Sequence, residues 1–159
     1  MIGSVNILDH VSVTVSDMDR SLAFYRDLLG LEEVERHRLV GKTISEMAGK
    51  PDVVMQVVRL QALETPGVLL DLQQYITPQG DISDAQLGDV AHSHFCFGVP
   101  DLFGTYTTLK AKGVEFVSEP VNFDLEWGIV HVVFFKDPDG FVLELMEYPI
   151  KRKASTDQP

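Results

Sequence analysis

Apolar and polar positions alternate at the start of the chain. Residues 8–17 read LDHVSVTVSD, which is rich in β-branched residues and ends at a helix-start signal. Successive side chains of a strand face opposite ways. One face of this predicted strand therefore carries Val11, Val13 and Val15. The other face carries His10, Ser12 and Thr14, so a histidine begins the polar face of a strand whose other face is apolar.

The periodicity then changes to that of a helix. Apolar residues recur three or four positions apart, which places them on one stripe of a helix, at Met18, Leu22, Tyr25 and Leu29. Ser16 or Asp17 can cap the start of this helix, and Gly30 suits its C-terminal end. The pattern predicts a strand followed by a helix.

The same pattern occurs a second time. HVSVTVSD over 10–17 is echoed by HFCFGVPD over 94–101, and a second helical stripe follows at Leu102, Tyr106 and Leu109. The halves also end in similar strands, VLLDLQQY over 68–75 and FVLELMEY over 141–148. Each half is interpreted as a strand, a helix and three further strands. We predict an α+β fold of two paired βαβββ modules that form a curved, barrel-like mixed sheet, with helices outside and a cleft inside.

The predicted organisation is a single domain over 1–150. Module one spans about 6–76, a polar, turn-rich linker spans about 77–92, and module two spans about 93–149. The polar residues 151–159 are expected to be a flexible tail.

Alternation places four chemically active residues on the cleft side at equivalent places in the two modules. Leu70 and Leu72 face the helix, so Asp71 and Gln73 face the cleft, and the same reasoning turns Glu144 inward. The resulting set is His10, Asp71, His94 and Glu144. A lone histidine at a strand start is more often structural than a ligand, but two at equivalent repeat positions favour a site. Imidazole and carboxylate together suit a divalent ion: Zn, Fe, Co, Ni, Mn or Mg.

Composition narrows the function classes. The net charge of −11 argues against binding to nucleic acid or to anionic membranes, both of which need basic patches. No segment has the ~20 apolar residues of a membrane span, and no secretory signal is visible. The single cysteine, Cys96, suits a reducing cytosol, so we expect a cytoplasmic protein. The basic stretch RHRLVGK over 36–42 is interpreted as a solvated surface loop or as an anchor for a substrate carboxylate or phosphate.

The paired modules resemble the vicinal oxygen chelate superfamily, which includes glyoxalase I, methylmalonyl-CoA epimerase, fosfomycin-resistance enzymes and extradiol dioxygenases. The resemblance rests on HVSVTVSDMDRSLAFYRDLLGL, HFCFGVPD and FFKDPDGFVLEL and covers about residues 10–148. It implies one divalent metal ion held by His10, His94 and Glu144. Asp71 stands where glyoxalase-like and epimerase-like members usually have Glu or Gln. As aspartate is one methylene shorter, Asp71 ligates directly, or through a water, or with help from Gln73.

The resemblance also implies a reaction class. The metal would bind two neighbouring substrate oxygens and stabilise an enolate, with Glu144 and Asp71 as the catalytic proton carriers. We expect an isomerase, epimerase or lyase, most like the epimerase-type members, acting on a small molecule such as an acyl-CoA or a thiol adduct. Two alternatives stay open: an Fe(II) extradiol dioxygenase, in which His131 would serve beside the metal, and a metal-free binding protein of the bleomycin-resistance type. A homodimer is expected from the resemblance alone.

Overall fold

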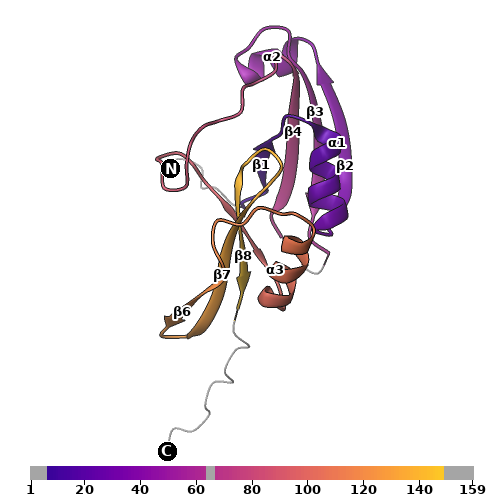
Figure 1. Cartoon of the computed structure of the whole chain (residues 1–159). Coiled ribbons are helices and arrows are strands. Elements are labelled where there is room, and N and C mark those ends of the chain that lie inside the picture. The colour runs from indigo at the N-terminus through magenta and orange to yellow at the C-terminus, as the bar shows by residue number, and fades with distance from the viewer. Residues whose placement is uncertain (1–6, 64–66, 149–159) are drawn as a thin grey trace, which may run out of the picture. The chain divides into compact units, whose positions relative to one another are not determined.

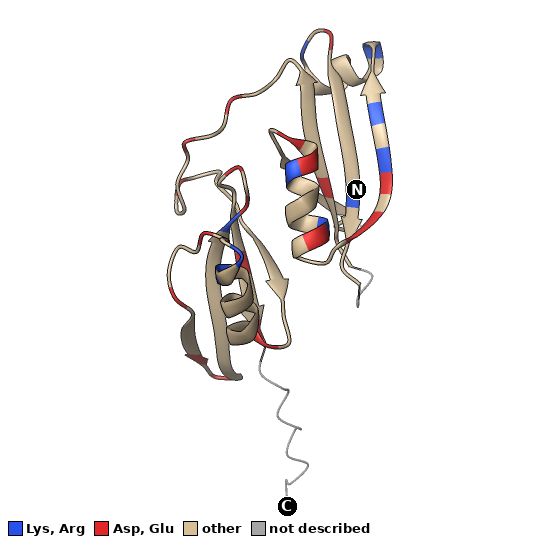
Figure 2. Cartoon of the chain, turned by 45° about the vertical axis from the view of Figure 1, so that its right-hand side comes forward, with Lys and Arg blue, Asp and Glu red and all other residues tan. Residues whose placement is uncertain are grey.

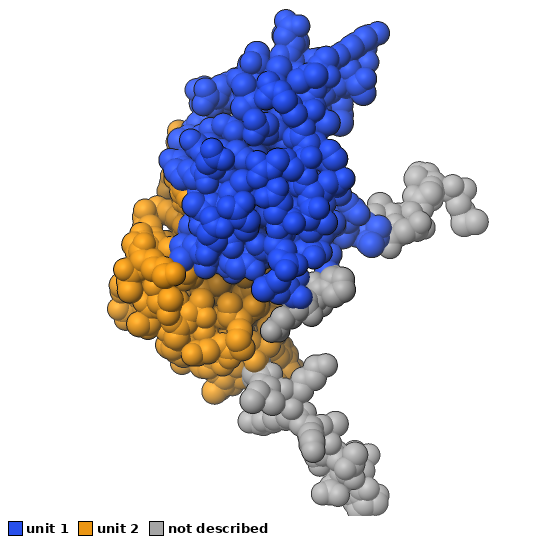
Figure 3. All heavy atoms as spheres, turned by 90° about the vertical axis from the view of Figure 1, so that its right-hand side faces the viewer, with its two compact units in different colours: residues 1–83 blue, residues 84–159 orange. Residues whose placement is uncertain are grey.

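The computed structural model of the chain describes residues 7–63 and 67–148. It divides into two compact units, residues 1–83 and 84–159 (Figure 3). The predicted tail at 151–159 lies outside the described residues. No helix in the described part of the chain is both long enough and apolar enough to cross a membrane.

Unit 1 contains a four-stranded mixed sheet with helices (Figure 1). In chain order its elements are β1 (His10–Thr14), α1 (Met18–Leu22), the π-helical segment η1 (Ala23–Leu28), β2 (Glu32–Val40), α2 (Lys42–Ala48), β3 (Val54–Gln61) and β4 (Leu69–Thr77). The strand order is β1-β4-β3-β2, in which β1 runs parallel to β4 and the other neighbours are antiparallel.

Unit 2 repeats this topology. Its elements are β5 (Phe95–Gly98), α3 (Leu102–Ala111), β6 (Val121–Leu125), β7 (Gly128–Lys136) and β8 (Val142–Glu147). The strand order is β5-β8-β7-β6, again with the first strand parallel to the last and the other pairs antiparallel. The α+β class and the duplicated βαβββ arrangement that the sequence predicts are therefore confirmed.

The predicted apolar faces form the core of unit 1. Strand residues and helix residues are buried together, namely Val13, Val15, Leu70, Leu72, Met18, Leu22 and Tyr25. Asp17 caps the helix, since its carboxylate accepts the backbone N–H of Arg20 at 2.9 Å. Gly30 has a φ of 82°, a left-handed conformation that favours glycine and ends the helix as expected.

Unit 2 buries the matching residues with one difference. Leu102 and Leu109 of α3 are buried, as are Leu143 and Leu145 of β8. Alternation along 94–99 also predicts Phe95 and Phe97 in the core, but both are only partly buried.

Two elements differ from the prediction. Helix α2 is an addition to module one that the sequence pattern did not reveal, because it is seven residues long and buries only Ile44. Conversely, the sequence after Gly113 predicts a short strand over 114–118. The structure has an isolated bridge between Phe116 and Phe135 there instead. Between β4 and β5, residues 78–94 form neither helix nor strand.

Candidate metal centre

His10 and Asp71 lie on neighbouring strands of unit 1. The parallel pairing of β1 with β4 places Ser12 opposite Asp71. His10 is two residues before Ser12 and therefore lies on the same face of the sheet. His10 Nε2 lies 3.8 Å from Asp71 Oδ2. The sequence therefore placed both residues on the correct face, and the sheet register brings them close together.

Asp9 fixes the orientation of the His10 ring. The His10 Nδ1 atom lies 2.9 Å from Asp9 Oδ2, and the hydrogen bond from His10 is the main cause that lowers the pKa of the Asp9 carboxyl. An Nδ1–H that donates to a carboxylate leaves Nε2 with its lone pair available. This arrangement is typical of metal-binding histidines, whose second nitrogen is held by a carboxylate.

Arg59 binds Asp71 and was missed from the sequence. The antiparallel register of β3 with β4 places the two residues opposite each other. Arg59 Nε donates to Asp71 Oδ1 at 2.7 Å, and Nη2 donates to Oδ2 at 2.8 Å. The hydrogen bond to Asp71 is the main cause that raises the pKa of Arg59. A lone arginine within the largely apolar stretch VVMQVVRLQ was the available signal.

His94 and Glu144 form the matching pair in unit 2. His94 Nε2 lies 3.3 Å from Glu144 Oε2, and the Glu144 side chain is 12% exposed. The His94 ring also packs edge-on against Phe134, with 5.0 Å between the ring centroids. Both modules therefore present a histidine–carboxylate pair on the sheet face opposite the helix.

Cys96 shares the face of Glu144. The two residues are register partners in the parallel pairing of β5 with β8. Although the residue as a whole is exposed, burial of the thiol, followed by the charge of Glu144, raises the Cys96 pKa to about 12. The thiol is therefore protonated at neutral pH, which argues against a nucleophilic role.

Two further residues considered from the sequence have other partners. Gln73 Nε2 donates to Ser12 Oγ at 3.1 Å. His131 Nδ1 lies 2.6 Å from Asn122 Oδ1, and the His131 ring packs against Phe103 of α3. His131 thus lies on the helix side of its sheet, away from the face that carries Glu144.

The basic stretch is largely paired with acidic neighbours. Arg36 donates to both oxygens of Glu33, at 2.8 and 2.9 Å, and His37 lies 2.9 Å from Glu35. Figure 2 shows acidic and basic residues following one another along β2. This favours the interpretation as a solvated surface over an anchor for a substrate anion.

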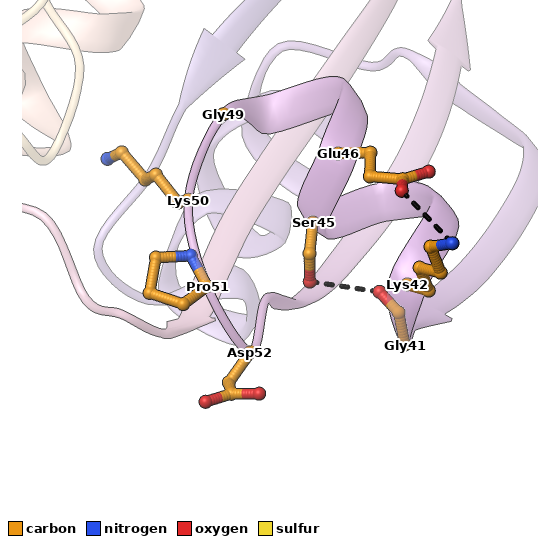
Figure 4. Close-up of a pocket in the computed structure, with 8 residues that line it drawn as sticks. All are labelled: Gly41, Lys42, Ser45, Glu46, Gly49, Lys50, Pro51 and Asp52. Atoms are coloured by element: carbon orange, nitrogen blue, oxygen red, sulfur yellow. Dashed lines mark hydrogen bonds and ion pairs between the residues drawn. The ribbon is translucent and has the colours of Figure 1, made fainter.

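A pocket of about 610 Å³ opens beside α2 in unit 1 (Figure 4). None of the four predicted ligands lines it. Its lysine Lys42 is directed to Glu46, and the Ser45 hydroxyl donates to the Gly41 carbonyl while accepting the Val53 N–H. Both of these side chains are thus engaged within the chain, and Lys50 lies over the Tyr75 ring, 5.5 Å from its centroid.

The two histidine–carboxylate pairs differ in how well their spacing suits two ligands of one divalent ion. Two ligand atoms each ~2.1 Å from one ion lie about 3.0 Å apart at a right angle and about 3.4 Å apart at the tetrahedral angle. The His94–Glu144 separation of 3.3 Å falls within that range, whereas the His10–Asp71 separation of 3.8 Å exceeds it. Among the described residues, no three His, Cys, Asp or Glu side chains gather closely enough to hold an ion. The four-residue ligand set stays a prediction.

The comparison with known proteins gives the class. A model of the glyoxalase/bleomycin resistance protein/dioxygenase superfamily matches residues 7–145, so the chain belongs to this superfamily. The resemblance to vicinal oxygen chelate proteins that the sequence indicates is therefore confirmed.

Two similar proteins within the superfamily are named as lactoylglutathione lyases. The chain is 28% identical over 139 residues to a probable lactoylglutathione lyase of Vibrio cholerae, covering 87% of this chain and 88% of that protein. It is 28% identical over 151 residues to the lactoylglutathione lyase of Pseudomonas aeruginosa, covering 89% and 82%.

Solved structures agree on the fold. A glyoxalase family protein from Bacillus cereus superposes with a TM-score of 0.80 at 19% identity, covering 92% of this chain and 96% of that one. The trypanothione-dependent glyoxalase I of Leishmania major gives 0.61 at 24% identity, covering 91% and 87%.

Proposed function

We propose that the protein is a divalent-metal-dependent enzyme of the glyoxalase type, a lyase or isomerase that acts on a small thiol adduct with two neighbouring oxygens. The observation that carries the proposal is the His94–Glu144 pair, whose 3.3 Å separation suits two ligands of one ion. Within unit 1, His10 has the carboxylate-held Nδ1 that is typical of a metal-binding histidine. The names of the relatives favour a lyase of this type over the epimerase that the sequence pattern alone suggests.

The bound ion would act as a Lewis acid on the two substrate oxygens and so lower the pKa of the neighbouring C–H. The protein groups then move the proton. Glu144 removes it from the carbon that carries sulfur and oxygen, and returns it to the adjacent carbon. The hydroxyl proton of the first carbon passes to the carbonyl oxygen of the second, so the hemithioacetal becomes its thioester isomer. Its 12% exposure limits competition from water for that proton.

The test begins with the purified full-length chain, stripped of metal and reloaded separately with Zn, Ni, Co, Mn or Fe(II). We expect one ion per chain and, with at least one of these ions, formation of lactoylglutathione from its hemithioacetal precursor. Acyl-CoA epimerisation and catechol oxidation are measured in parallel. Absence of stoichiometric metal would favour a binding protein, and ring cleavage with Fe(II) would favour a dioxygenase.

Subunit number belongs to the same proposal. The homodimer expected from the family resemblance stays a prediction, and light scattering at working concentration tests it. A fully active monomer would contradict the predicted homodimer without affecting the proposed chemistry.

A further inference from the structure

We infer that Arg59 is a positioning residue in unit 1: it holds Asp71 as its own counter-ion, so that the His10–Asp71 pair offers a metal ion the histidine and not the carboxylate. The inference rests on the proposed function, because it concerns how the same ion is held. It assigns Asp71 a role different from the one its sequence position suggests.

The first argument is the contact itself. Arg59 binds both Asp71 oxygens at 2.7 and 2.8 Å in the two-pronged geometry that is the strongest form of this pair. The Asp71 side chain is 5% exposed and that of Arg59 is 27% exposed, so little water competes for the contact. A carboxylate that shares its charge with a guanidinium in a dry setting is a weaker donor to a second cation.

The second argument is the spacing from histidine to carboxylate. Asp71 Oδ2, the oxygen nearer to His10, also accepts the Arg59 Nη2–H, and the His10 nitrogen lies 3.8 Å from it. The corresponding separation in unit 2 is 3.3 Å. If Asp71 moved to close the longer gap around an ion, it would move away from Arg59 at the expense of two charged hydrogen bonds.

The third argument is the asymmetry between the duplicated modules. The residue opposite Asp71 on the adjacent antiparallel strand is Arg59, whereas the residue opposite Glu144 is Phe134. Among the residues that the structure describes, no lysine or arginine contacts Glu144. Unit 1 thus supplies a cation, Arg59, for its carboxylate. In unit 2, Glu144 has no such cation among the described residues.

The variants follow from this reasoning. Asp71→Asn removes the charge but keeps an oxygen for Arg59. Arg59→Met removes the counter-ion and frees a carboxylate beside His10, whereas Arg59→Lys retains a cation. Arg36→Met is the matched control, because Arg36 makes the same two-pronged contact with Glu33 on an exposed part of β2. Each full-length variant is titrated with Co(II) and Zn(II), and the visible Co(II) spectrum is recorded.

We expect Asp71→Asn and Arg59→Lys to keep the wild-type Co(II) spectrum with less than about ten-fold change in affinity, and Arg36→Met to change neither. Arg59→Met should bind Co(II) about ten-fold more tightly or better, with an altered spectrum, because a further ligand has become available. Metal should also raise its unfolding temperature more than that of the wild type.

Two results would overturn the inference. One is loss of more than ten-fold in affinity, with a changed spectrum, in Asp71→Asn. The other is a folded Arg59→Met variant with unchanged or weaker binding. If Arg59→Met does not fold, Asp71→Asn and Arg59→Lys decide by the same criteria. A wild-type chain that binds neither ion overturns the proposed function and this inference together, whereas failure of Asp71→Asn in a metal-binding wild type overturns the inference alone.

Discussion

Arg59 binds Asp71 across the β3–β4 pair through two hydrogen bonds of 2.7 and 2.8 Å, beside the buried residues Leu60, Leu70 and Leu72. An isolated charge left behind at such a place is costly. The pair therefore has a consequence for stability that can be measured separately from any metal.

Replacement of Asp71 by alanine should lower the free energy of unfolding by about 2–4 kcal/mol, since the partly exposed Arg59 recovers some hydration. In the double variant Arg59→Met/Asp71→Leu, no unpaired charge remains, and most of the loss should be recovered. Urea unfolding of the metal-free wild type, Arg59→Met, Asp71→Leu and the double variant gives the coupling energy, for which we expect about 1–3 kcal/mol. Strictly additive losses would show that the two side chains do not depend on each other.

Loss of either proposed ligand in unit 2, His94 or Glu144, should abolish the proposed metal retention while the fold survives. His94 is 39% exposed at its side chain, so His94→Ala leaves no large cavity, and Glu144→Gln preserves shape. Each should weaken Zn(II) binding by about 100-fold or more, a larger effect than loss of an outer-shell partner. Elemental analysis and circular dichroism measure the two properties. His37→Ala is the control histidine, paired only with Glu35, and unchanged metal content in His94→Ala would remove His94 from the site.

The Cys96 thiol should react slowly in the metal-free protein. Because its pKa is raised to about 12, the thiolate becomes the main form only at strongly alkaline pH. At pH 8 a group with that pKa is roughly 0.01% ionised, against tens of per cent for an ordinary thiol. Iodoacetamide labelling should therefore be much slower in the folded protein than in urea.

The Glu144→Gln variant separates the two causes of that slow reaction. Removing the neighbouring negative charge leaves burial unchanged, so labelling at pH 8 should accelerate but stay below the rate in urea. Equal rates in the wild type and the variant would show that the carboxylate does not act on the thiol.

The N-terminal caps of α1 and α3 should contribute similar amounts to the free energy of unfolding. Asp17 accepts the backbone N–H of Arg20, and Asp101 accepts that of Gly104, each at 2.9 Å. Replacement by alanine should lower the free energy of unfolding by about 1 kcal/mol at either site. Serine at position 101 retains a capping oxygen and serves as the control. If the Asp101→Ala and Asp101→Ser variants were equally stable, the cap would make no measurable contribution to stability.

Much of the architecture follows from local periodicity. Alternation along 10–15 and 68–75 identified the buried faces of β1 and β4, and the helical stripe from Met18 identified the side of the helix that packs on them. Repetition of both patterns revealed the two modules and placed His94 and Glu144 on one face. These properties depend on which way a side chain points relative to its neighbours in the chain, and that is fixed by backbone geometry.

The local pattern did not determine which charged residues pair with each other. That Asp71 meets Arg59, while Glu144 meets Phe134, depends on the register between strands, which is set by the turns and by the burial of whole faces. Helix α2 likewise forms where only Ile44 is buried, too little apolar surface to mark a helix in the sequence. Local pattern therefore determined which residues face the candidate site, and long-range strand pairing determined which of their charges were already neutralised.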